Sequence, residues 1–128
     1  MKKSYLLSGM IVLGAVVGLN AMQQRPLGWQ ELDRCIVNER IDWKCVFSLL
    51  TFYRGTNLVN EYRDLQYDEP LLELAVEEYN VPATRKLLQE FNANPNVSSS
   101  ILYEAKSYMS DPEGLVQLLR QYGAREKF

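Results

Sequence analysis

The chain has 128 residues, enough for one domain with a hydrophobic core and too few for two domains of ordinary size. Its 14 basic and 16 acidic residues give a net charge of -2, which argues against a dedicated nucleic-acid-binding protein because such proteins carry a basic excess. It contains no histidine, so catalytic triads and histidine-bound zinc are excluded, and two cysteines are too few for a cysteine-only zinc site. We therefore expect a protein that is not an enzyme and has no metal or cofactor.

Residues 1–21 have the pattern of a secretory signal peptide. Two lysines precede an uncharged stretch, Ser4–Gln24, whose centre, Tyr5–Leu19, is strongly apolar. Cleavage after Ala21 or after Gly18 fits this pattern, and an uncleaved membrane anchor is the alternative because the uncharged stretch is just long enough to span a bilayer. In either case we expect the rest of the chain outside the cytoplasm, in the bacterial periplasm or envelope, or secreted.

Removal of this segment makes the chain more acidic. From Met22 onward about 107 residues remain, with 12 basic and 16 acidic side chains and a net charge of -4. Residues 25–128 contain no low-complexity tract and no glycine- or serine-rich linker. We therefore expect a single domain over 25–128.

Apolar residues at helical spacing, separated by turn formers, predict short helices throughout this domain. The first two are expected over 29–38 and from Asp42 to Gly55, the next two begin at Pro70 and Pro82, and the fifth covers 100–109. The last helix is the most clearly marked. Asp111 is a suitable N-cap, Pro112 suits the first position, and Gly123 supplies a stop after Tyr122.

These helices repeat along the chain. The pairs Leu87-Leu88 and Leu118-Leu119 are 31 residues apart, and Leu49-Leu50 precedes the former by 38 residues. Ala75 and Ala105, in the preceding helices, are 30 apart. Self-similarity at 30–40 residues with two short helices per unit predicts an all-α helical solenoid, in which neighbouring units bury each other's apolar faces.

The segments LLELAV at 71–76 and RKLLQEFNANPN at 85–96 together resemble an ankyrin repeat. A second, terminal unit is similar over 100–105 and 115–124, with Asn92 standing where this family has its closing glycine. The resemblance covers residues 68–124 well and 29–66 weakly, and implies about three repeats. The family's Thr-Pro-Leu-His start is absent. An unrelated helical bundle or another helix-turn-helix solenoid is the alternative fold.

Cys35 and Cys45 are candidates for a disulfide. Export would place them in an oxidising compartment, and in the repeat interpretation they lie on the two antiparallel helices of the first unit. A bridge closing so short a loop stabilises by roughly 2–3 kcal/mol. Two buried free thiols are the alternative, and the spacing is not that of a redox-active CxxC motif.

Acidic side chains dominate the segment between Arg63 and Arg85, which contains no base. Glu73 and Glu77 are four residues apart and so share one helix face. Paired carboxylates can perform acid-base chemistry or bind calcium, but the residue order of a calcium loop is missing. We expect a solvated acidic face that attracts a basic partner.

Tyrosines are plentiful, and tyrosine is enriched at protein interfaces. Partners of ankyrin repeats usually contact the loop tips and the inner face of the first helices. The resemblance therefore implies a partner-binding surface with these members: Tyr67, Asp68, Glu69, Glu73, Glu77, Asn96, Val97, Ser98 and Tyr103.

These features together predict an exported protein-protein interaction module. One version is an immunity protein that neutralises a secreted toxin in the periplasm. The alternatives are a membrane-anchored structural or assembly subunit of an envelope complex and a small enzyme that uses carboxylates or tyrosines.

Overall fold

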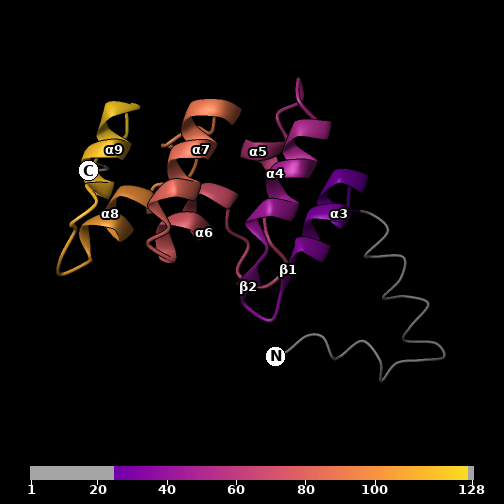
Figure 1. Ribbon diagram of the computed structural model, residues 1–128, viewed down its shortest axis with the longest axis horizontal. Helices are drawn as coiled ribbons and strands as arrows, with labels where there is room; N and C mark the ends of the chain where they lie inside the picture. The colour runs from indigo at the N-terminus through magenta and orange to yellow at the C-terminus, as the bar shows by residue number, and fades with distance from the viewer. Residues whose placement is uncertain (1–24, 127–128) are drawn as a thin grey trace. The chain divides into compact units, whose positions relative to one another are not determined.

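The computed structural model describes residues 25–126 (Figure 1), and the predicted signal segment lies outside the described residues. The chain divides into two compact units, Met1–Leu49 and Leu50–Phe128. The secondary structure is mostly helical, in agreement with the predicted all-α class. Within residues 25–126, no helix is both long and apolar enough to cross a membrane.

The first unit contains a short β-hairpin that the sequence analysis did not predict. Helix α3 covers Leu27–Cys35 and ends three residues earlier than expected, because strands β1 (Ile36–Val37) and β2 (Arg40–Ile41) follow it. Asn38 and Glu39 both have positive φ angles, as a two-residue hairpin turn requires. Helix α4 then covers Trp43–Phe52, with its final residues in the second unit.

The two cysteine sulfur atoms lie at bonding distance, as the sequence analysis expected. The Sγ atoms of Cys35 and Cys45 are 1.97 Å apart and their Cα atoms 5.7 Å apart. Cys35 is the last residue of α3 and Cys45 lies in the first turn of α4. The Asp42 N–H also donates to the Cys35 carbonyl, so the hairpin and the bridge join the same two helices.

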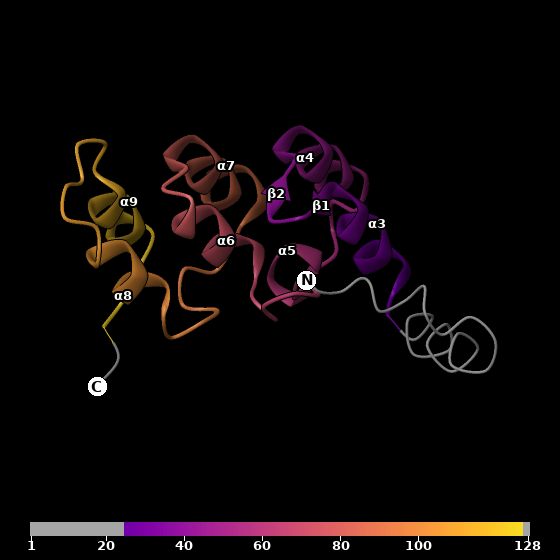
Figure 2. The same cartoon turned by 90° about the horizontal axis from the view of Figure 1, so that it is seen from below.

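The second unit contains helices α5 (Leu58–Glu61), α6 (Leu71–Glu77), α7 (Val81–Phe91), α8 (Ile101–Lys106) and α9 (Leu115–Gln121). Helix α6 packs against α7 and α8, and α8 packs against α9. The pairs α6–α7 and α8–α9 follow one another in both views (Figures 1 and 2). The residues that fill the core between them include Leu71, Leu72, Leu87, Ile101, Leu115 and Leu119.

The predicted helix stops are present where a left-handed residue was expected. Asn92 ends α7 with φ 59°, and Gly123 follows α9 with φ 99°. Asp111 does cap α9, accepting the N–H groups of Leu115 and Val116, but Pro112 lies in a turn ahead of the helix rather than at its first position.

The predicted helix over 100–109 is shorter than its apolar pattern indicated. It ends at Lys106, and Met109 is fully exposed instead of packing in the apolar stripe. The Ser100 hydroxyl does not cap this helix but donates to Glu73 of α6. The long connection between the first two leucine pairs is also explained, because the extra helix α5 lies within it.

An asparagine side chain connects α5 to the loop after α7. Asn60 Nδ2 donates to the Asn92 carbonyl at 3.3 Å, and Asn60 Oδ1 accepts the Asn94 N–H at 2.7 Å. One side-chain amide thus satisfies a backbone acceptor and a backbone donor two residues apart, which fixes the course of that loop.

A second asparagine makes the same pair of contacts one unit later. Asn96 Nδ2 donates to the Gly123 carbonyl at 2.9 Å, and Asn96 Oδ1 accepts the Arg125 N–H at 3.0 Å. The backbone groups that it contacts are 31 residues after those contacted by Asn60. The two helix pairs therefore share a connecting device as well as an apolar pattern.

We expect Asn96→Ala to lower the free energy of unfolding by about 1 kcal/mol, because it removes two hydrogen bonds at an exposed site. Asn96→Asp keeps the acceptor and loses the donor, so its loss should be smaller. Urea unfolding followed by circular dichroism measures both. Gln121→Ala, at an exposed position of α9, is the control and should change little. Equal stability of Asn96→Ala and wild type would contradict this role.

Candidate functional site

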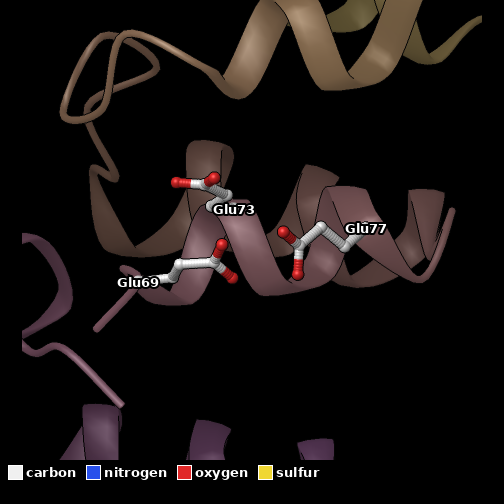
Figure 3. A group of neighbouring side chains, drawn as sticks. All are labelled: Glu69, Glu73 and Glu77. Atoms are coloured by element: carbon white, nitrogen blue, oxygen red, sulfur yellow. The ribbon is translucent and has the colours of Figure 1, made fainter. Parts of the chain in front are cut away.

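Three carboxylates from α6 and the residue just before its N-cap converge on one site. Glu73 and Glu77 are one helical turn apart, and Glu69 precedes the N-cap residue Pro70. One oxygen atom of each carboxylate lies within 4.8 Å of the other two. Figure 3 shows the three groups turned toward one another. We refer to Glu69, Glu73 and Glu77 as the carboxylate cluster.

The loop that carries Glu69 is fixed by a buried aspartate. The Asp64 carboxylate accepts the N–H groups of Tyr67 and Glu69 at 3.1 and 2.8 Å. Asp64 is 4% exposed, and Asp68 takes a positive φ of 56° within the turn. The turn therefore holds Glu69 beside the start of α6 while Tyr67 and Asp68 remain exposed.

Glu73 is buried, which corrects the expectation of a wholly solvated acidic face. It is 5% exposed and accepts a hydrogen bond from the Ser100 hydroxyl at 2.8 Å. Ser100 lies next to α8, so this contact joins the two first helices of successive pairs. Glu69 and Glu77 are half-buried. The cluster is thus partly enclosed by the packing of α6 against α8.

Burial and mutual repulsion favour the protonated form of this cluster. Burial raises the pKa of Glu69 to about 8, helped by a hydrogen bond to Glu77 and by the charges of Glu73 and Asp64. Burial also raises the pKa of Glu77, with repulsion from Glu73 and from Glu104 of α8. Glu69 Oε1 is buried with no hydrogen-bond partner. The pair therefore retains a proton at neutral pH.

No lysine or arginine of the described chain lies within ion-pair distance of the carboxylate cluster. Three carboxylate oxygens are ligands that a hard divalent cation accepts, although Ca²⁺ takes roughly six to eight oxygens and would need several more from water or a partner. A cationic group from another protein satisfies the same carboxylates with fewer donors.

The two tyrosines predicted for the partner surface are exposed on segments that flank the cluster. Tyr67 is 51% exposed and lies two residues before Glu69. Tyr103 is 75% exposed in the first turn of α8, three residues after the serine that contacts Glu73. We refer to the carboxylate cluster together with Tyr67, Asp68 and Tyr103 as the acidic face.

The structure separates the second predicted loop tip from this face. Asn96 spends its side-chain amide on the loop after α9. Asn96 and Ser98 line a cleft of about 870 Å³ near the C-terminus instead of the carboxylate cluster. Val97, between them, is half-buried. The expected surface is therefore two sites, the acidic face and the C-terminal cleft.

The sequence analysis missed Ser100 and Glu104 as neighbours of the carboxylate cluster. Both come from the segment 30 residues after α6, so the 30-residue offset of the first helices was the available signal. It also missed Tyr108, whose hydroxyl lies 2.8 and 2.6 Å from the carbonyls of Val76 and Glu77. These contacts hold the C-terminal end of α6, and with it Glu77, in place.

The chain matches no protein-family model, no curated protein and no solved structure.

Proposed function

We propose that this chain is an exported protein-protein interaction module built from about three ankyrin-like repeats. In this proposal it is not an enzyme. It binds a protein partner in the periplasm or envelope through rigid surface complementarity. One form of this function is an immunity protein that neutralises a secreted toxin. Export rests on the signal-like pattern of residues 1–21.

The repeat interpretation is supported by features that recur at one spacing. Asn80 and Asp111 cap the second helices α7 and α9 and are 31 residues apart. Asn92 and Gly123 end those helices at the same offset. The paired contacts of Asn60 and Asn96 follow it too. Stacked repeats present a continuous, rigid surface, which is how solenoids bind proteins.

The observation that carries the proposal is the acidic face with no cation of its own. Burying carboxylates is costly unless an opposite charge or hydrogen bonds compensate. Here Glu69 retains a proton instead, as its pKa of about 8 indicates, and Glu69 Oε1 bonds to nothing. A lysine or arginine from a partner would provide the missing donor, and Tyr67 and Tyr103 would supply contact area beside it.

This mechanism makes binding depend on pH. A cationic side chain that enters the carboxylate cluster competes with the proton held by Glu69 and Glu77. The bound form is deprotonated, so affinity should rise with pH up to about 8, the folded pKa of Glu69. Below that pH we expect affinity to fall by at most about tenfold per pH unit, the limit for a single displaced proton.

Capture of the partner with matched variants tests the proposal. The full chain, tagged and crosslinked in the cells that produce it, is purified from the envelope fraction and its partners are quantified by mass spectrometry. We expect Glu77→Gln to reduce recovery of the partner about tenfold, because a desolvated charge pair is lost. Glu113→Gln removes an exposed charge in the turn before α9 and should leave recovery unchanged. Equal recovery with both variants would refute the acidic face as the binding surface.

A further inference from the structure

The C-terminal cleft is lined by cations, in contrast to the acidic face. Arg120 of α9 and Arg125 line the cleft of about 870 Å³, and Arg125 and Lys106 of α8 line an adjoining hollow of about 300 Å³. The hydroxyl-bearing residue Ser99 and the apolar residue Leu102 line both. Cations, hydroxyl groups and an apolar floor together suit a ligand that has a carboxylate on a carbon chain.

A carboxylate of the chain itself already occupies this position. Lys106 Nζ lies 3.0 and 2.7 Å from the two carboxylate oxygens of Glu126, and Arg120 contacts Glu126 Oε2 at 3.0 Å. The ion pairs lower the pKa of the Glu126 carboxyl, the hydrogen bond from Lys106 being the main cause. Two helices thus direct their cations at one carboxylate near the end of the chain.

This internal contact can be displaced. All three of its side chains are 43–52% exposed, and exposed ion pairs contribute little because solvent screens them. Glu126 also lies at the end of a short segment whose last anchoring bond is that of the Arg125 N–H to Asn96. A carboxylate from another molecule therefore competes with Glu126 at little cost.

We propose that the C-terminal cleft binds an acidic peptide segment of a protein partner, and that Glu126 is an internal ligand which this segment replaces. The glutamate side chain of the peptide would accept from Lys106 and Arg120, and Arg125 would pair with a second carboxylate. This site does not depend on the acidic face. A partner with both basic and acidic segments could use both surfaces.

Fluorescence anisotropy with a labelled pentaglutamate peptide tests the proposal on the full chain. We expect Glu126→Gln to raise the affinity roughly three- to fivefold, because a competing internal ligand is removed. Arg120→Gln should weaken binding at least about tenfold, since it removes a charge-assisted hydrogen bond to the carboxylate. Lys86→Gln removes an exposed base on α7 and is the control for net charge.

Three outcomes would overturn the proposal. Glu126→Gln could bind the peptide no better than wild type, or Lys86→Gln could weaken binding as much as Arg120→Gln does. Inorganic phosphate could also displace the peptide at concentrations near that of the peptide's own dissociation constant, which would indicate a simple anion site. A labelled pentaglutamine peptide should not bind, and binding of that peptide would likewise contradict recognition of carboxylates.

Discussion

Glu69→Gln is expected to raise the free energy of unfolding at pH 7.5 by about 1–2 kcal/mol, since solvent screens part of the repulsion that the neutral amide relieves. The pKa of Glu69 is about 8 in the folded protein against 4.5 as its ordinary value. The folded state therefore binds more protons than the unfolded state between these pH values. The stability that the protonated carboxyl contributes is fully present below pH 4.5 and is lost as the pH rises to 8.

Urea unfolding at half-unit steps from pH 4.5 to 8.5 measures this dependence. Wild type should lose stability over the interval, and Glu69→Gln should lose much less because its side chain does not titrate. Glu61→Gln, at an exposed position of α5, controls for a change of net charge and should follow wild type. If wild type and Glu69→Gln had parallel profiles, the carboxylate cluster would not hold the extra proton.

The second large effect is expected from the bridge of the first unit. Replacing Cys35 and Cys45 with alanine should cost about 2–3 kcal/mol of stability, because the unfolded chain regains the freedom of a short closed loop. The residues between them form only a two-strand hairpin, which is marginal by itself. Both tryptophans of the chain, Trp29 and Trp43, lie in this unit, so their fluorescence reports its unfolding selectively.

Adding a reductant to wild type should reproduce the effect of the double alanine variant in the tryptophan signal. The variant itself should not respond to the reductant, which makes it the internal control. Far-ultraviolet circular dichroism, which also reports the helices of the second unit, should change less. A tryptophan transition unaffected by both treatments would show that the bridge adds no stability to the first unit.

Much of the second unit could be predicted because its signals are local. The leucine pairs place the second helices, and Asn92 and Gly123 end them, since each stop needs only a residue that tolerates positive φ. The β-hairpin after α3 was missed because Ile36 and Val37 continue an apolar pattern that suits a helix or a strand. Its turn residues, Asn38 and Glu39, are not a strong hairpin signal.

The candidate site was predictable only in part, because its character depends on contacts between distant residues. The four-residue spacing of Glu73 and Glu77 correctly predicted that they share a face. The burial of Glu73 depends on the packing of α8, and its partner Ser100 is 27 residues away. Likewise, nothing local indicates that the Asn96 side chain is used by the loop after α9. Residue types and spacing therefore gave the members of the site, whereas their environments required the packed helices.

Site-specific photocrosslinking in the producing cells tests the central claim most directly. A photoreactive amino acid placed at Tyr67 or at Tyr103 lies on the acidic face, and one placed at exposed Gln89 of α7 lies outside it. The account predicts one covalent adduct with the same partner protein from both tyrosine positions and none from Gln89. An adduct from Gln89 alone, or no adduct from either tyrosine position, would contradict it.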